Sequence, residues 1–287
     1  MLFMPGNNKK ILGKIENIDA DAVILDLEDG VPREEKGKAR ELITERLNDL
    51  AGKDLNKKIF VRINDSRQQC WRKDCIAALS PELDGLVVPM VNSSTEIRRL
   101  ETLLSTLITG LKDVKLSELS LILNIETAKG FINLKEILSS SGLIGGAALG
   151  GEDLTLDIGA NRTSSGREID YARSRLVMVT KALNQLAIDT VFTDINDLEG
   201  LKKEATEANN MGYDGKLLIH PSQIGPVNEI FAPGEEEIRF AQLVVDAFKK
   251  AQKEGRSVTK VEGKMIDPPV AARAERLLQK MEVYASD

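Results

Sequence analysis

The chain has 287 residues, a formal net charge of −6 at pH 7 and 29% charged residues. This is the composition of an ordinary globular protein that is long enough to bury a large core. The acidic balance and the lack of a run rich in lysine and arginine exclude nucleic acid as an expected partner, and no apolar stretch reaches the roughly 20 residues that a membrane span needs.

The two cysteines lie close together in one segment with helical character. Cys70 and Cys75 are five positions apart, and residues at that spacing do not share a helix face. We therefore expect neither a disulfide nor a metal clip. Two reduced thiols are typical of a cytoplasmic protein, and the cytoplasm is the compartment that we predict.

Eight short apolar runs with strand character alternate along the chain with segments of helical periodicity. Most of the runs are rich in Val, Ile and Leu with little alternation, which is typical of parallel strands covered on both faces. The runs are residues 2–4, 22–27, 58–63, 85–88, 120–125, 143–149, 190–193 and 216–219. The helical segments between them include residues 33–49, 94–107, 168–186 and 198–210.

Repeated strand–helix units are compatible with an open doubly wound sheet or with a closed barrel. Eight units within about 230 residues favour an α/β fold of the (β/α)₈ TIM-barrel type, with its active site at the carboxyl ends of the strands. No Gly-x-Gly-x-x-Gly motif follows an early strand, which argues against a dinucleotide-binding sheet. We assign residues 1–231 to the catalytic barrel.

The rest of the chain does not continue the repeat. A helix over residues 223–231 ends at Ala232-Pro233-Gly234, and a long helix over residues 235–254 follows. Two short strand-like runs, 257–261 and 264–266, then precede a final helix from about residue 269. We interpret residues 232–287 as a C-terminal helical lid or arm, because added segments complete sites that a barrel leaves open.

Two carboxylates follow consecutive strand-like runs. Glu126 comes directly after the run 120–125, and Asp153 follows Gly150 and Gly151 at the end of the run 143–149. Parallel strands end side by side, and Mg²⁺ takes one or two carboxylates together with water and substrate oxygens. We predict that Glu126 and Asp153 hold Mg²⁺, which Mn²⁺ can replace. The alternative is that each carboxylate caps the helix after it.

Charged side chains also end the second and third runs. Asp26, Glu28 and Asp29 place three carboxylates within four residues, which repel one another unless a cation or donors compensate. Arg62, at the end of the third run, suits bidentate binding of a carboxylate or oxyanion. We expect all four to line the site. A solvated acidic loop, and a structural partnership between Arg62 and the carboxylates, are the alternatives.

Two further residues are candidates at the site. The only histidine, His220, follows the eighth run and precedes Pro221, so a site-lining role and a structural role are both open. Asp267 ends a short apolar run in the C-terminal segment, where it is either an acid at the site or the first residue of a helix. One histidine in this position forms no Ser/His/Asp set, and no Walker motif is present.

Together these motifs resemble those of the citrate lyase β-subunit family and its malyl-CoA and citramalyl-CoA lyase relatives, in the HpcH/HpaI aldolase superfamily. The resemblance covers nearly the whole chain. It is carried by Leu2-Phe3-Met4-Pro5-Gly6, Asp26-Leu27-Glu28-Asp29, Val61-Arg62-Ile63-Asn64, Ile125-Glu126-Thr127-Ala128, Gly150-Gly151-Glu152-Asp153-Leu154, residues 189–194, Gly215-Lys216-Leu217-Leu218-Ile219-His220-Pro221 and Gly263-Lys264-Met265-Ile266-Asp267.

The resemblance implies reversible carbon–carbon cleavage of a 3-hydroxyacyl thioester, such as malyl-CoA or citramalyl-CoA, to an acyl-CoA and a 2-oxo acid. It implies that Glu126 and Asp153 hold Mg²⁺ and that Arg62 holds the substrate. It also implies a catalytic acid at Asp267, typically contributed across the interface of a homotrimer, or of a hexamer. We expect the backbone N–H groups of Gly150 and Gly151 to bind the substrate carboxylate.

Two departures from the family pattern bear on which activity within the family we expect. Met90 stands where the family often has lysine, and His220 stands where citrate lyase β-subunits tend to have asparagine, which favours a stand-alone lyase. The rival functions are a citrate lyase β-subunit acting on a carrier-bound citryl thioester, a malate synthase-like condensation with thioester hydrolysis, and a non-catalytic acyl-CoA-binding barrel. Arg33, Lys36 and Arg40 could contact CoA phosphates, although a solvated helix face explains them better.

Overall fold

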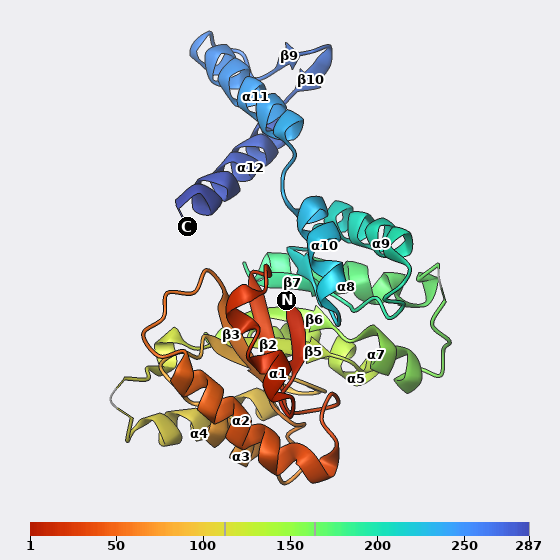
Figure 1. Ribbon diagram of the computed structural model, residues 1–287. Coiled ribbons are helices and arrows are strands. Elements are labelled where there is room, and N and C mark those ends of the chain that lie inside the picture. Colours follow the sequence, from red (N-terminus) through yellow and green to blue (C-terminus); the bar gives the residue numbers. More distant parts are fainter. Residues whose placement is uncertain (112, 164, 287) are drawn as a thin grey trace. The chain divides into compact units, whose positions relative to one another are not determined.

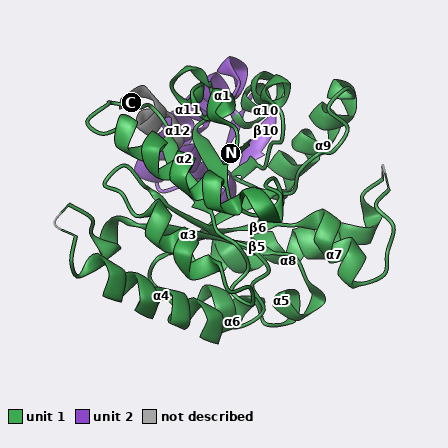
Figure 2. Cartoon of the chain, turned by 60° about the horizontal axis from the view of Figure 1, so that its bottom comes forward, with its two compact units in different colours: residues 1–231 green, residues 232–287 purple. Residues whose placement is uncertain are grey.

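The computed structural model describes residues 1–111, 113–163 and 165–286, with side chains as far as residue 279. Asp287, the last residue of the expected C-terminal segment, lies outside the described residues. The chain divides into two compact units, Met1–Phe231 and Ala232–Asp287 (Figure 2). Among the described residues, no helix is both long enough and apolar enough to cross a membrane.

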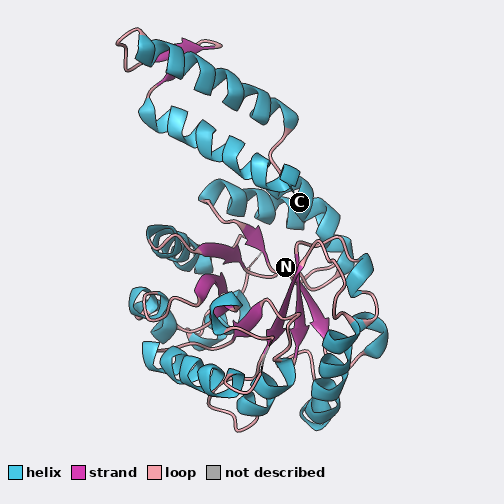
Figure 3. Cartoon of the chain, turned by 90° about the vertical axis from the view of Figure 1, so that its left-hand side faces the viewer, coloured by secondary structure: helices cyan, strands magenta, loops and turns pink. Residues whose placement is uncertain are grey.

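Eight parallel strands form one sheet in sequence order, with helices around its outer face (Figures 1 and 3). The strands are β1 (Leu2–Pro5), β2 (Ala22–Asp26), β3 (Lys58–Arg62), β4 (Gly85–Val88), β5 (Ser120–Ile125), β6 (Ile144–Leu149), β7 (Leu186–Asp189) and β8 (Gly215–Lys216). Leu2 pairs with Leu218 in a parallel bridge, so β1 meets the segment after β8. The Phe3 N–H donates to the Leu218 carbonyl at 2.9 Å across this junction. The predicted (β/α)₈ barrel is confirmed.

The helices bury their apolar faces against the outward-facing residues of the strands, and Leu25, Ile43 and Leu104 belong to this main core. The helices of the barrel are α1 (Lys9–Leu12), α2 (Lys36–Asp49), α3 (Trp71–Ala78), α4 (Ser94–Ile108), α5 (Ala128–Ile132), α6 (Leu134–Leu138), α7 (Gly151–Asp157), α8 (Asp170–Ala182), α9 (Leu198–Met211) and α10 (Ile224–Phe231).

The seventh strand lies four residues earlier than predicted. We expected a helix to residue 186 and a strand over 190–193, but α8 ends at Ala182 and β7 begins at Leu186. Asn184 adopts a left-handed φ of 55° between them. Leu183 and Leu186 continue the apolar helical spacing of α8, which hid the end of the helix. The eighth strand is likewise shorter than the predicted run 216–219.

The inside of the barrel is built in layers, because every second residue of a strand points inward. One buried layer is apolar and comprises Ala22, Ile24, Phe60, Val87, Ile122, Ala148, Ile188 and Leu217. Two residues further along five of these strands, the sequence places Asp26, Arg62, Asn124, Gly150 and Thr190. The apolar layer is therefore the floor of a polar site at the carboxyl ends of the strands.

The second unit is a helical pair with a hairpin. It contains α11 (Glu235–Lys253), β9 (Thr259–Val261), β10 (Lys264–Ile266) and α12 (Pro268–Ser286). The strands pair antiparallel through the two-residue turn Glu262-Gly263, whose φ angles of 46° and 80° match a type I′ hairpin turn. Val244, Phe248, Val261 and Ile266 form part of its own small core.

Candidate active site

A cleft of about 410 Å³ opens at the carboxyl ends of the strands. Its lining includes seven of the residues expected at the site, namely Asp26, Asp29, Arg62, Glu126, Gly150, Gly151 and Asp153. Phe3, Pro5, Gly30, Asn124, Leu149, Glu152, Thr190, Val191, Leu217 and Ile219 complete the lining. Side chains that are far apart in the sequence thus meet at one end of the barrel.

Arg62 is held by the acidic turn after β2. Its Nε and Nη2 donate to the two carboxylate oxygens of Asp26 at 2.7 and 2.6 Å, and its Nη1 lies 2.9 Å from Glu28 Oε2. Burial alone would lower the pKa of Arg62, but Asp26 and Glu28 outweigh it and the pKa is raised. Arg62 is therefore a permanent cation that partners the acidic cluster and also lines the cleft.

The acidic turn is stabilised by donors as well as by Arg62. The N–H groups of Glu28 and Gly30 each donate to Asp26 at 2.9 Å. Glu28 is buried and does not line the cleft. Burial raises its pKa to about 9, while the neighbouring Arg62 lowers it. Asp29 is exposed at the rim, as a solvated acidic loop would be.

Glu126 is buried at the end of β5, with both oxygens engaged. Its Oε2 accepts a hydrogen bond from the Met90 N–H at 2.6 Å, and its Oε1 accepts one from Asn124 Nδ2 at 3.2 Å. Burial raises the pKa of Glu126 to about 7, while Arg62 lowers it and Asp153 raises it. A Cβ at Gly150 would lie 2.1 Å from Glu126 Cγ, so the absence of a side chain there lets the end of β6 pass this carboxylate.

Asp153 lies in the first turn of α7 and is partly exposed. Burial raises the pKa of this carboxyl, Asp29 raises it further and Arg62 opposes the shift. Neither predicted metal ligand is the cap of the following helix, because Thr127 occupies that position for α5 and Gly150 for α7.

The pair Glu126 and Asp153 fits a hard divalent cation. Both line one cleft, and each pKa is raised by burial and by neighbouring carboxylates, a condition that a bound cation reverses. Among the described residues, no group of three or more His, Cys, Asp or Glu side chains could hold a metal ion. Mg²⁺ is commonly bound by two carboxylates, with water and substrate oxygens in its other coordination positions.

The backbone N–H groups of Gly150 and Gly151 donate hydrogen bonds to other groups of the barrel. The Gly150 N–H donates to the Ile125 carbonyl at 3.1 Å, and the Gly151 N–H donates to Thr190 Oγ1 at 3.0 Å. Both N–H groups therefore have acceptors within the barrel, and binding of a substrate carboxylate by them stays a prediction. The Glu152 N–H, next in α7, is one that a helix leaves without an internal acceptor.

Asn124 and Thr190 line the cleft and were missed. Asn124 is 2% exposed and lies two residues before Glu126 in β5, so the period of two could have found it. Its Oδ1 has no hydrogen-bond partner among the described residues. Thr190 is fully buried. The sequence did not indicate it as a site residue, because the seventh strand was predicted in the wrong place.

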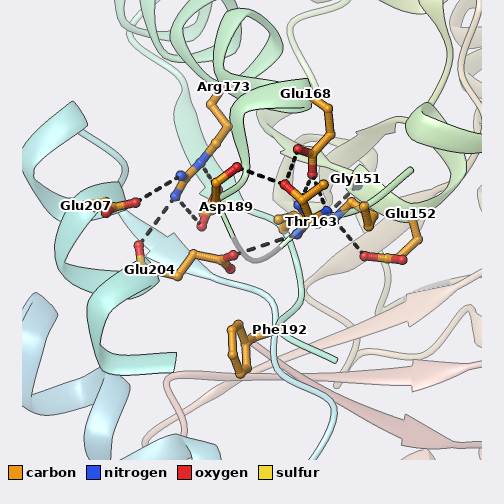
Figure 4. Close-up of polar contacts among 12 residues, drawn as sticks. Gly151, Glu152, Thr163, Glu168, Arg173, Asp189, Phe192, Glu204 and Glu207 are labelled. Atoms are coloured by element: carbon orange, nitrogen blue, oxygen red, sulfur yellow. Dashed lines mark hydrogen bonds and ion pairs between the residues drawn. The ribbon is translucent and has the colours of Figure 1, made fainter. Parts of the chain in front are cut away.

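A buried ion cluster fixes β7, the strand that Thr190 directly follows. Arg173 on α8 donates to both oxygens of Asp189 at 3.1 and 3.0 Å (Figure 4). Lys216 Nζ lies 2.7 Å from Asp189 and 2.6 Å from Glu204 on α9. Burial would raise the pKa of Asp189, but Lys216 and Arg173 lower it overall. The cluster thus ties β7 and β8 to the two helices outside them.

His220 and Asp267 have local structural contacts. His220 is exposed outside the cleft, where its Nδ1 accepts the Ser222 N–H at 3.2 Å and caps a short 3₁₀ helix. Asp267, in the second unit, accepts the Val270 N–H at 3.1 Å at the start of α12. Both structural alternatives left open by the sequence are therefore present.

Two of the three basic residues considered for CoA phosphates are engaged elsewhere. Lys36 donates to Asn64 Oδ1, and Arg40 Nη1 lies 2.8 Å from Asp74. Asn64 and Asp74 are buried beside β3, so these two cations satisfy buried polar groups rather than forming a solvated face.

Comparison with known proteins identifies the family. The HpcH/HpaI aldolase/citrate lyase profile matches residues 1–221. The chain belongs to this family. Citrate lyase subunit beta of Leuconostoc mesenteroides subsp. cremoris is 35% identical over 283 residues, covering 97% of this chain and 91% of that protein. Mitochondrial citramalyl-CoA lyase of Rattus norvegicus is 34% identical over 289 residues, covering 97% and 84%.

The fold agrees with a solved member of the family. CitE from Mycobacterium tuberculosis, in complex with magnesium, acetoacetate and coenzyme A, superposes with a TM-score of 0.78 at 30% sequence identity. The match covers 97% of this chain and 96% of that one. The structural match thus extends over nearly all of both chains, and the resemblance inferred from the motifs is confirmed.

Proposed function

We propose that this protein is a Mg²⁺-dependent carbon–carbon lyase. It reversibly cleaves a 3-hydroxyacyl-CoA with a carboxylate on the hydroxyl carbon, such as malyl-CoA or citramalyl-CoA, into an acyl-CoA and a 2-oxo acid. The carrying observation is the pair Glu126 and Asp153 on one cleft, opposite the permanently charged Arg62. The magnesium and coenzyme A bound by the solved CitE support the proposal.

The residues have distinct roles in this reaction. Mg²⁺ held by Glu126 and Asp153 would supply Lewis-acid polarisation of the substrate oxygens. Arg62 faces the negative charge that develops on the thioester oxygen when the carbon–carbon bond breaks, and stabilises it electrostatically. During cleavage the hydroxyl proton passes to water as the carbonyl of the 2-oxo acid forms, and Asp267 gives a proton to the enolate carbon; during condensation Asp267 removes that proton. Met90 and Asn124 hold the Glu126 carboxylate in place through their hydrogen bonds.

Asp267 belongs to the second unit, which we propose acts as a lid. The family resemblance supports a homotrimer, or a hexamer, in which Asp267 completes the site of a neighbouring barrel. Asp267 lies between β10 and α12 and accepts the Val270 N–H, so hairpin and helix together fix its position within the unit. The reduced thiols support a cytoplasmic location for the enzyme.

A citrate lyase β-subunit is the second candidate. The 35% identity to the Leuconostoc protein over 97% of this chain favours it. The same cleft would then take a citryl thioester on a carrier protein, and oxaloacetate would be the 2-oxo acid product.

A panel of thioesters tests the proposal. We expect the purified chain with Mg²⁺ to convert malyl-CoA to glyoxylate and acetyl-CoA, or citramalyl-CoA to pyruvate and acetyl-CoA. Turnover of carrier-bound citryl thioester alone would favour the second candidate. Free CoA formed from acetyl-CoA and glyoxylate would reveal hydrolysis after condensation. Binding of acyl-CoA without any cleavage would contradict the lyase and indicate a binding barrel.

A further inference from the structure

Asn124 lines the cleft, and one atom of its side chain is a buried hydrogen-bond acceptor without a partner among the described residues. Its Nδ2 donates to Glu126 Oε1 at 3.2 Å, and this contact sets which way the amide points. Its Oδ1 is buried and has no hydrogen-bond partner among the described residues. Buried acceptors without a donor are rare and destabilising, so a donor from outside the described residues, such as a ligand bound in the cleft, would stabilise this atom.

The surrounding side chains do not supply that donor. With a divalent cation bound, Asp153 and Glu126 are ionised and, like ionised Asp26, have only acceptor oxygens. The guanidinium of Arg62 is directed to Asp26 and Glu28. The neutral amide of Asn124 offers an acceptor without adding charge to a cleft that is already rich in carboxylates, so it suits an uncharged O–H donor.

We propose that Asn124 Oδ1 accepts a hydrogen bond from the hydroxyl group of the substrate and thereby selects a hydroxyl-bearing acyl group over its deoxy counterpart. The inference rests on the proposed function and deepens it. In the acyl part of the proposed substrate, with its carboxylate ionised, the hydroxyl is the single hydrogen-bond donor, because the carboxylate and the thioester carbonyl are acceptors. A site built to bind a hydroxyl also disfavours ligands that lack it.

The test uses malate and succinate, which differ only by a hydroxyl group and, not being thioesters, are not cleaved. The full-length chain, loaded with Mg²⁺, is titrated calorimetrically with each acid. We expect the wild type to bind malate more tightly than succinate. In Asn124→Leu, which has neither donor nor acceptor, we expect this preference to fall about tenfold. Asn124→Asp keeps an acceptor but loses the donor to Glu126, and should retain the preference.

Several results would overturn the inference. An unchanged preference in Asn124→Leu would do so, as would a wild type that binds both acids equally or binds neither. Equal loss of preference in both variants would mean that Asn124 acts only by orienting Glu126. Both variants are also titrated with Mg²⁺ alone. If Asn124→Leu alone binds Mg²⁺ more weakly and the preference for malate is unchanged, the donor to Asn124 Oδ1 is a water bound to the cation, and the inference fails.

The cleavage assay separates the two proposals. If the wild type cleaves malyl-CoA while the acid preference does not depend on Asn124, only the role of Asn124 fails. If none of the thioesters is cleaved, the proposed function fails. Thermal unfolding of each variant confirms that the protein titrated is folded.

Discussion

At the scale of single residues, the mouth of the barrel is organised by unbalanced negative charge. The pKa values of Glu28, Glu126 and Asp153 are raised, because burial and neighbouring carboxylates disfavour their ionised forms. Arg62 neutralises only part of this negative charge, because its guanidinium already donates two hydrogen bonds to Asp26. The remaining charge makes the cleft receptive to a divalent cation.

Replacing Arg62 by lysine separates its chemical role from its structural role. Lysine keeps the charge but loses the planar fork that holds Asp26, so we expect Arg62→Lys to lower kcat/KM by roughly tenfold or more, or about 1.4 kcal/mol. Steady-state kinetics on the preferred thioester measure this. Unchanged kinetics together with a lowered thermal stability would show that Arg62 only supports the acidic turn.

Gly150 provides a steric test of the position of Glu126. In Gly150→Ala the new Cβ would lie 2.1 Å from Glu126 Cγ, so the carboxylate must move, and we expect Mg²⁺ affinity to fall on the order of tenfold to a hundredfold. Gly37→Ala is the matched control, because a Cβ there meets nothing within 4 Å. Equal Mg²⁺ affinity in the two variants would argue against Glu126 as a ligand.

At the scale of elements, the alternation along each strand explains both the successes and the failures of prediction. Carboxylates at the ends of two consecutive apolar runs predicted that Glu126 and Asp153 share one site, and both line the cleft, because the ends of buried strands can be recognised in the sequence. Thr190 was lost because Leu183 and Leu186 extend the apolar spacing of α8 past its end. The engagement of the Gly151 N–H by Thr190 depends on contact between neighbouring strands, which no local pattern encodes.

The ion cluster between the strands and the outer helices predicts a pH-dependent stability. The folded pKa of Asp189 is lowered, so its contribution is fully present above the ordinary aspartate pKa of about 3.9 and is lost as pH falls through the lower folded value. Asp189→Asn should be less stable than the wild type by on the order of 3–5 kcal/mol near pH 6.

Urea unfolding of both proteins at several pH values measures the difference. We expect the gap between wild type and Asp189→Asn to narrow below about pH 4, because Asp189 then binds a proton and loses its ion pairs. The other carboxylates titrate in both proteins and cancel in the comparison. A gap that does not change with pH would show that the charge of Asp189 is not what stabilises the cluster.

At the scale of the whole molecule, the proposed machinery is divided between two units. The barrel carries Glu126, Asp153 and Arg62, whereas Asp267 lies in the unit Ala232–Asp287. The sequence indicated this division through the break at Ala232-Pro233-Gly234. It could not show which barrel Asp267 serves, because that depends on contacts between chains.

Mixing two variants tests whether Asp267 acts in trans. Glu126→Ala and Asp267→Ala should each be inactive alone. After subunit exchange, some sites would combine an intact metal pair with an intact Asp267 from the neighbouring chain, so we expect activity to return. Exchange is verified with differently tagged chains. Confirmed exchange without recovered activity would mean that Asp267 serves its own barrel or has no catalytic role.

The metal dependence of cleavage tests the central claim most directly. The chain is stripped with EDTA and assayed for 2-oxo acid release from its preferred thioester while Mg²⁺ or Mn²⁺ is added back. We predict that activity is absent in EDTA, that either cation restores it in the wild type, and that neither restores it in the folded variants Glu126→Ala and Asp153→Ala. Full turnover in EDTA, or metal-restored turnover in both variants, would contradict the account.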